Sequence, residues 1–193
     1  IRYVKQKDAH QFSIALLELL ENYPKPALDV LMNLLSSHDT ERILTVLAFD
    51  NPEDFPVEKR PDYKLTASEY QLAKDRFYIA SFIQFTLPGV PCIYYGDEIG
   101  MYGFRDPYNR QTFNLKDKDD EVLAFYQELT NFRHKYQEDF KADCDIIKVT
   151  DGCIAYKRGK LLCIINLDHS AHFIENYSGE ILYQKGEFYP TPY

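Results

Sequence analysis

Three stretches of the chain carry apolar residues at the spacing of a helix that packs one face against a core. The first begins behind Asp8, a favourable N-cap residue, and ends before Pro24. The second opens on Thr66 and Glu69, which have the spacing of a capping box. Helices are therefore predicted over residues 8–22, 66–85 and 118–138.

Two short apolar runs lie between these helices, over residues 30–35 and 92–95. Each run is short and is followed at once by polar residues, which is typical of strands buried on both faces of a parallel sheet. The first run leads into Ser36–Asp39 and the second into Gly96–Glu98. Because α/β folds place their chemistry at the carboxyl ends of their strands, these two polar segments are the candidate site.

From about residue 142 the apolar period changes from helical to roughly two, which indicates antiparallel strands. Strands are predicted over 144–149, 153–157 and 161–167, with shorter candidates at 171–175, 181–184 and 187–189. The change of period predicts two domains. Residues 1–140 form an α/β part, and residues 141–193 form a small all-β antiparallel domain of sandwich type.

Composition excludes some function classes. Lys and Arg number 22 against 30 Asp and Glu, so the net charge of -8 disfavours a nucleic-acid partner. No apolar run approaches the roughly 18 residues that cross a bilayer, so no membrane partner is expected. The four cysteines lie in apolar runs without Cys-x-x-Cys spacing, which favours reduced thiols and a cytoplasmic location. The chain starts at Ile1 without an initiator Met, so secretion is left open.

The candidate chemistry centres on His38 and Asp39, an imidazole beside a carboxylate at a strand end. By spacing alone, the pair fits a catalytic site and fits equally well a turn in which Asp39 is a cap and His38 packs. No His or Cys pair has the spacing of zinc ligands, so neither a metal site nor a cofactor is predicted.

Three motifs in order carry a resemblance to a known family. Residues 33–42, NLLSSHDTER, are similar to the fourth conserved region of the α-amylase family of glycoside hydrolases, which follows barrel strand seven. Residues 89–100, GVPCIYYGDEIG, resemble its strand-eight segment. Residues 106–110, DPYNR, resemble the donor-side sugar-binding loop of its neopullulanase and cyclomaltodextrinase members. The resemblance implies the C-terminal part of a (β/α)8 TIM barrel, strands seven and eight, followed by the family's C-terminal β domain.

The resemblance also implies roles for individual residues. Asp39 matches the family's third catalytic carboxylate, which grips the distorted sugar and stabilises its developing positive charge in a retaining hydrolysis. His38 matches a neighbour that donates to hydroxyls of the same sugar. Asp106 and Arg110 match a pair that binds sugars further along the donor side. Arg42 is expected to brace the strand-seven loop.

Departures from the family limit these expectations. Residues 111–113, QTF, follow Arg110 where the family usually has a Met and a Trp, so the preferred glucan is open. The nucleophilic Asp and the acid Glu belong to segments after strands four and five, for which no substitute is found here. We therefore expect a C-terminal fragment that is inactive alone, and any calcium site would lie in the missing part.

The implied parent is a hydrolase of α-1,4-glucans such as starch, pullulan, cyclodextrins or maltooligosaccharides. The alternative is a noncatalytic carbohydrate-binding or structural module. The expected partners are α-glucan oligosaccharides and the missing N-terminal part of the barrel. A second copy of the chain, in a homo-oligomer, is a further candidate, because two strands of a barrel expose apolar faces near residues 30–35 and 90–95.

Overall fold

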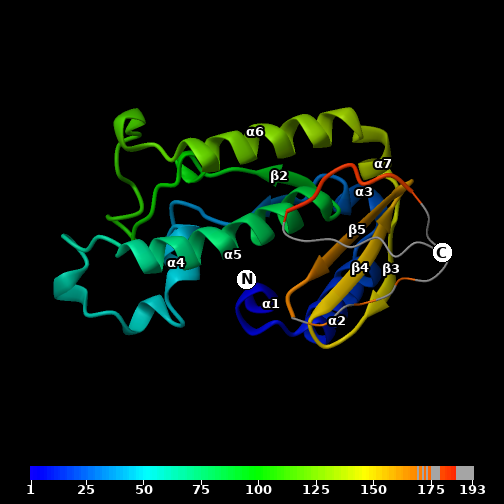
Figure 1. The fold of residues 1–193 in the computed structure, drawn as a ribbon, viewed down its shortest axis with the longest axis horizontal. Coiled ribbons are helices and arrows are strands. Elements are labelled where there is room, and N and C mark those ends of the chain that lie inside the picture. The colour runs from blue at the N-terminus through cyan, green and yellow to red at the C-terminus, as the bar shows by residue number, and fades with distance from the viewer. Residues whose placement is uncertain (169, 171, 173, 175–178, 186–193) are drawn as a thin grey trace.

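The computed structural model describes residues 1–168, 170, 172, 174 and 179–185 (Figure 1). The α-helices in this part of the chain are α1 (Arg2–Gln6), α2 (Ala9–Asn22), α3 (Lys25–Leu28), α4 (Ile43–Ala48), α5 (Ala67–Thr86), α6 (Asp120–Lys135) and α7 (Gln137–Lys141). The strands are β1 (Met32–Leu34), β2 (Val90–Cys92), β3 (Cys144–Val149), β4 (Cys153–Arg158) and β5 (Leu161–Asn166). Short 3-10 turns occupy Pro52–Asp54, Val57–Lys59, Asp97–Ile99 and Leu115–Asp117.

The three predicted long helices are confirmed as α2, α5 and α6. The carboxylate of Asp8 accepts a hydrogen bond from the amide of Gln11 at 2.9 Å, which caps α2. Thr66 and Glu69 form the expected capping box at the start of α5. The third prediction was too long, because the backbone leaves the helical conformation at Tyr136 and α7 begins separately.

Strands β1 and β2 pair in parallel, with Met32 opposite Val90 and Leu34 opposite Cys92. The prediction of the second strand at 92–95 was displaced by two residues. Its true start is fixed by the bond from the amide of Val90 to the carbonyl of Leu31. A turn then begins at Tyr94, whose carbonyl accepts from the amide of Asp97, so residues 93–95 cannot continue the ladder.

The expectation that the first strand is buried on both faces was wrong for this chain. Val30, Met32 and Leu34 keep 72%, 62% and 50% of their surface exposed. Helix α5 covers the other face of the pair, where Gln84 donates to the carbonyls of Asn33 and Cys92. Within the described residues β1 and β2 form a two-stranded sheet, and the apolar side chains near 30–35 and 90–95 on its uncovered face are exposed.

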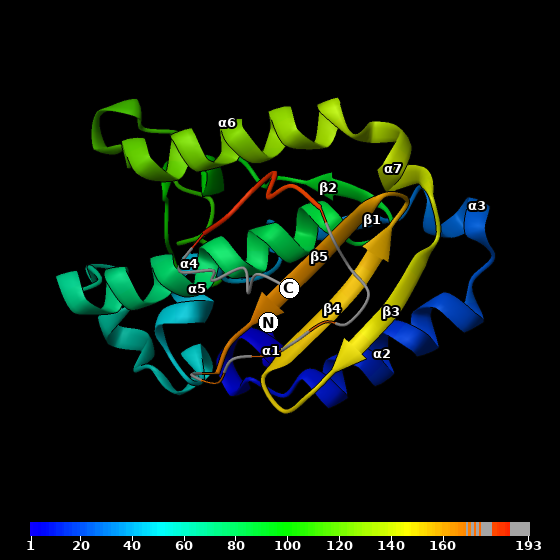
Figure 2. The ribbon, with the colours of Figure 1, turned by 45° about the vertical axis from the view of Figure 1, so that its right-hand side comes forward.

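Strands β3, β4 and β5 form an antiparallel sheet in sequence order, with Ala155 opposite Ile164 and a register shift between Ile146 and Lys148. Figure 2 shows this sheet beside α2. Its buried face packs against α2 and α5 in one apolar cluster that includes Leu16 and Phe82, so helices occupy the place of a second sheet. Among the described residues, 181–184 form no strand, and the candidates at 171–175 and 187–189 lie largely or wholly outside those residues.

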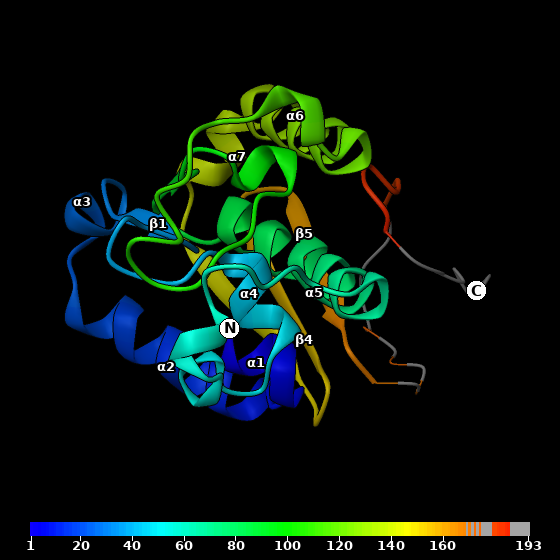
Figure 3. The ribbon, with the colours of Figure 1, turned by 90° about the vertical axis from the view of Figure 1, so that its left-hand side faces the viewer.

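A second apolar cluster joins α4, α5 and α6 through Leu44, Leu47, Phe77 and Leu129, all fully buried. Figure 3 shows α6 above α5, and α4 close to the N-terminal end of the chain. Helix α4 was not predicted, because its six residues are too few to establish a helical period. Within the described ranges, no helix is both long enough and apolar enough to cross a membrane.

Candidate functional site

The candidate site is built from two loops that follow β1 and β2. Residues 35–42 connect β1 to α4, and residues 93–119 connect β2 to α6. Because β1 and β2 are parallel neighbours, both loops leave the sheet at the same end. The backbone amide of Arg42 donates to the carbonyl of Gly103 at 3.0 Å, and the amide of Gly103 donates to the hydroxyl of Thr45 at 2.8 Å. The two loops therefore form one surface.

The four predicted site residues lie together on this surface. Nε2 of His38 is 3.2 Å from Oδ2 of Asp39, and Nη2 of Arg110 is 3.7 Å from Oδ1 of Asp39. Nε of Arg110 also lies 3.2 Å from Oδ1 of Asp106. The side chain of Asp39 is 72% exposed and points away from the core. The arrangement leaves its carboxylate accessible to a ligand.

Asn109 joins the two loops beneath these side chains. It is fully buried, and its Nδ2 lies 2.7 Å from the carbonyl oxygen of Thr40 and 2.9 Å from that of His38. Nε of Arg110 donates to the same His38 carbonyl at 3.1 Å. The segment after β2 thus binds the backbone on both sides of Asp39.

A buried charged pair forms the base of the site. Nη1 of Arg42 donates to the carbonyl of Tyr95 at 2.7 Å and to Oδ1 of Asp97 at 3.3 Å. The guanidinium also lies over the rings of Tyr94 and Tyr95, 4.7 Å and 4.8 Å from their centroids. Burial raises the pKa of Asp97 to about 7, although the Ser36 hydroxyl and Arg42 favour its ionised form. Arg42 braces the loop, and its side chain has no exposed surface with which to touch a ligand.

The exposed groups form a polar surface suited to hydroxyl-rich ligands. Carboxylates accept hydrogen bonds and a guanidinium donates them, so the cluster can bind several hydroxyls of one ring. One guanidinium lies between the carboxylates of Asp39 and Asp106, which leaves one negative charge in excess. That excess suits a ligand on which positive charge develops. Within the described ranges, no group of three His, Cys, Asp or Glu side chains is arranged to hold a metal ion.

Residues 3–143 match the family described as alpha amylase, catalytic domain. The chain belongs to this α-amylase family. The match covers well over half of the chain and includes all four clustered residues.

Similar sequences in the α-amylase family carry names of starch-related enzymes. The chain is 33% identical over 151 residues to an amylopullulanase of Thermoanaerobacter thermohydrosulfuricus, covering 78% of this chain and 10% of that protein. It is 31% identical over 180 residues to a cyclomaltodextrinase of Bacillus sp, covering 89% and 28%. A neopullulanase 2 of Thermoactinomyces vulgaris is 34% identical over 129 residues, covering 66% and 18%. The chain therefore spans less than a third of each relative.

Two solved structures are likewise matched over less than a third of their own length. A cyclomaltodextrinase aligns with a TM-score of 0.65 and 31% identity, over 86% of this chain and 26% of that one. The native debranching enzyme of Nostoc punctiforme aligns with a TM-score of 0.64 and 24% identity, over 81% and 28%. The chain thus has a fold found in α-amylase-family proteins, which contain a TIM barrel and antiparallel strands.

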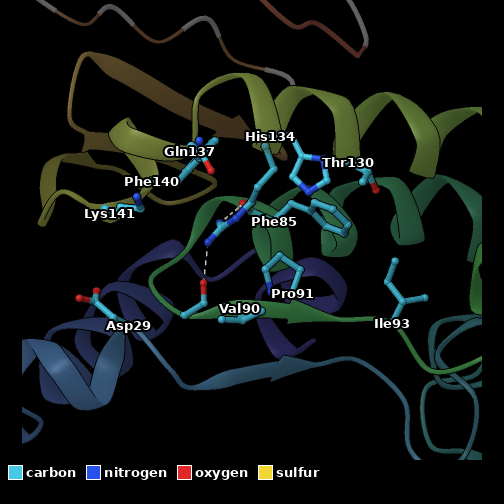
Figure 4. Close-up of a pocket in the computed structure, with 12 residues that line it drawn as sticks. Asp29, Phe85, Val90, Pro91, Ile93, Thr130, His134, Gln137, Phe140 and Lys141 are labelled. Atoms are coloured by element: carbon cyan, nitrogen blue, oxygen red, sulfur yellow. Dashed lines mark hydrogen bonds between the residues drawn. The ribbon is translucent and has the colours of Figure 1, made fainter.

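A groove of about 580 Å³ lies elsewhere in this α-amylase-family chain, between β2 and the helices α6 and α7 (Figure 4). Its walls include Val90, Pro91 and Ile93 on one side and Thr130 and His134 on the other. None of the four clustered site residues lines it. The groove follows the edge of β2 that lies opposite β1. Because its lining includes no residue of the cluster around Asp39, the groove is not part of that site.

Sequence reasoning missed two contributors to the site. Asn109 stood inside a quoted motif without a role, because its buried contacts are with residues about 70 positions earlier. The stack of Arg42 on Tyr94 and Tyr95 was also not predicted. The run of two tyrosines after a short apolar segment was the available signal, and it equally fits ordinary core packing.

Proposed function

We propose that this chain forms the strand-seven and strand-eight end of the active site of a retaining hydrolase of α-1,4-glucans. Asp39 stabilises the sugar on which positive charge develops when the glycosidic bond opens. His38 donates to hydroxyls of that sugar, and Asp106 with Arg110 holds sugars further along the donor side. The nucleophile and the acid come from the part of the barrel that would precede this chain.

The single observation that supports this proposal most strongly is the convergence of Asp39 and Asp106 on Arg110. These residues come from two different loops, and the contacts bring them to one exposed surface at the carboxyl ends of parallel strands. Barrel enzymes place their chemistry there. A turn in which Asp39 serves only as a cap would not require a partner about 70 residues away.

The proposal includes a finer assignment of the fold. We assign residues 1–140 to the barrel and residues 141–193 to the C-terminal β domain. The family match ends at residue 143, one residue before β3 begins, which supports this boundary. In this assignment, the exposed face of β1 and β2 and the groove along β2 contact the missing strands and helices. Without them, a second copy of the chain covers the same apolar surface.

The catalytic proposal is tested in a complete enzyme, in which this chain follows the segments that supply the nucleophile and the acid. Asp39→Asn should lower turnover at least about 100-fold with only a modest loss of sugar binding. The matched control is Asp62→Asn, which makes the same change at an exposed loop position. Near-normal turnover of Asp39→Asn would remove Asp39 from the catalytic set.

The alternative is a noncatalytic carbohydrate-binding or structural module. It is favoured by one observation, namely that no substitute for the nucleophilic Asp or the acid Glu is found in this sequence. Titration of maltoheptaose into the chain itself separates the two functions. Millimolar binding without hydrolysis favours the module, and hydrolysis by the chain alone would contradict the need for a preceding part.

A further inference from the structure

Asn109 lies in the loop after β2, yet its side-chain nitrogen is directed at the loop after β1. Nδ2 is 2.7 Å from the carbonyl oxygen of Thr40, 2.9 Å from that of His38 and 3.3 Å from that of Ser37. The side chain is fully buried. An amide nitrogen carries two hydrogens, so the two shorter contacts are the principal hydrogen bonds.

The orientation of this amide is fixed by its surroundings. In the reverse orientation, Oδ1 would face three carbonyl oxygens, which are all acceptors. In the observed orientation, Oδ1 of Asn109 is buried and has no hydrogen-bond partner within the described structure. Asn109 therefore donates hydrogen bonds to the carbonyl groups of the neighbouring loop, while its own Oδ1 has no partner within the described residues. An apolar residue at this position could not donate these bonds and so would not join the loops.

The two principal bonds hold the peptide groups on either side of Asp39. His38 precedes Asp39 and Thr40 follows it, whereas the Asp39 side chain is 72% exposed and has little packing around it. The local bond from the amide of Asp39 to the hydroxyl of Ser37, 3.2 Å long, is exposed to water. Apart from its exposed contacts with His38 and Arg110, the direction of the Asp39 carboxylate therefore depends on the backbone that Asn109 holds.

We propose that Asn109 is a positioning residue, which orients the Asp39 carboxylate toward the sugar through the backbone of residues 38–40. This inference rests on the proposed function, because it assigns Asn109 a part in the action of Asp39. A residue that never touches the substrate can still affect turnover strongly, since a displacement of about 1 Å can cost about 100-fold in rate.

The first measurement uses the chain as it stands. Asn109→Ala removes the donors without adding a charge, and Asn51→Ala makes the same change at an exposed asparagine in another loop. Backbone ¹⁵N relaxation should show increased motion of residues 37–40 in Asn109→Ala, whereas Asn51→Ala should leave these residues unchanged. Asn109→Asp, which directs a carboxylate at the carbonyls, should have a larger effect. Unchanged relaxation of residues 37–40 in Asn109→Ala would overturn the inference.

The second measurement separates positioning from a merely structural role. In the complete enzyme, Asn109→Ala should lower kcat about 10- to 100-fold on maltoheptaose and change KM less than about threefold. In an Asp39→Asn background, the same substitution should cause little further loss of kcat, because the group it positions is already disabled. Thermal melting of each variant checks that it is folded.

Each result has one meaning. An equal fold-loss of kcat in both backgrounds would overturn the inference, since Asn109 would then act independently of Asp39. A loss confined to KM would also overturn it. Near-normal turnover of Asp39→Asn would instead overturn the proposed function, and the relaxation data would still decide whether Asn109 orders residues 37–40.

Discussion

The guanidinium of Arg42 lies 3.3 Å from the carboxylate of Asp97, and both side chains are almost completely excluded from solvent. This contact joins the end of the loop after β1 to the turn after β2, beneath the exposed cluster around Asp39. Burial raises the pKa of the Asp97 carboxyl group to about 7. The stability of the site should therefore depend on pH in a predictable direction.

Asp97 should make the protein less stable as pH rises between about 4 and 7. The folded state keeps its proton to higher pH than the unfolded state, so the folded state binds more protons in this window. The stability that protonated Asp97 contributes is complete below its pKa in the unfolded chain, and it is lost as pH rises through its pKa in the folded protein. Denaturant unfolding followed by circular dichroism should give up to about 1.4 kcal/mol of loss per pH unit relative to Asp97→Asn. Equal pH slopes for both proteins would contradict the raised pKa.

Replacement of Arg110 by Lys should weaken sugar binding although the charge is kept. The guanidinium contacts Asp39, Asp106 and the His38 carbonyl at once, which a single ammonium group cannot reproduce. We expect about a tenfold loss of maltooligosaccharide affinity in the complete enzyme, measured by calorimetry, equivalent to about 1.4 kcal/mol. Arg105→Lys is the control in the same loop, because the Arg105 guanidinium lies 3.8 Å from the carboxylate of Glu41 and belongs to none of the ion pairs of Asp39 or Asp106. Similar affinities for both variants would count against a sugar-binding Arg110.

The chain should associate through the open face of β1 and β2. Met32 and Val90 are opposite each other in the register and are 62% and 49% exposed. Light scattering should show an apparent mass that rises with concentration, and the double variant Met32→Glu, Val90→Glu should suppress this rise. Val57→Glu changes a similarly exposed apolar residue in another loop and should leave the rise in apparent mass unchanged. A monodisperse monomer at high concentration would contradict the prediction.

Loss of the capping box should destabilise the chain without affecting the site directly. The Thr66 hydroxyl accepts from the amide of Glu69 at 3.3 Å, and the Glu69 carboxylate accepts from the amide of Thr66 at 2.7 Å. Thr66→Ala should cost about 1 kcal/mol of unfolding free energy in a denaturant titration. Glu69→Gln keeps the acceptor oxygen and should cost less. A larger loss of unfolding free energy for Glu69→Gln than for Thr66→Ala would show that the charge of Glu69 contributes more than the capping hydrogen bonds.

The helices were predictable because their information is local. Asp8 caps α2 and Thr66 caps α5 at the predicted positions, and the apolar stripes behind them are long enough to establish a period. Strands β3 to β5 were predicted from their alternation for the same reason. Helix α4 has too few residues for such a signal, and it forms because Leu44 and Leu47 pack against α5 in the apolar cluster that also includes residues of α6.

The site was predictable only in part. The motifs placed Asp39 and Arg110 in one site, and the structure brings their side chains to within 3.7 Å. The position of β2 depended on its pairing with β1, a contact between segments nearly 60 residues apart that no local pattern encodes. The burial of Asn109 and Arg42 depends on the same nonlocal packing.

The sequence alone thus determined the three long helices, the antiparallel strands β3 to β5, the family and the segments that carry the polar chemistry, because each of these depends on neighbouring residues. The sequence assigned Arg42 as a brace of the loop, but only the tertiary structure decided how far each polar side chain is buried. Arg42 and Arg110 are both arginines in loops beside the sheet, yet Arg42 is fully buried against the rings of Tyr94 and Tyr95, whereas the Arg110 side chain is 45% exposed. That difference is one of solvation, and solvation is set by which distant segments pack over a residue.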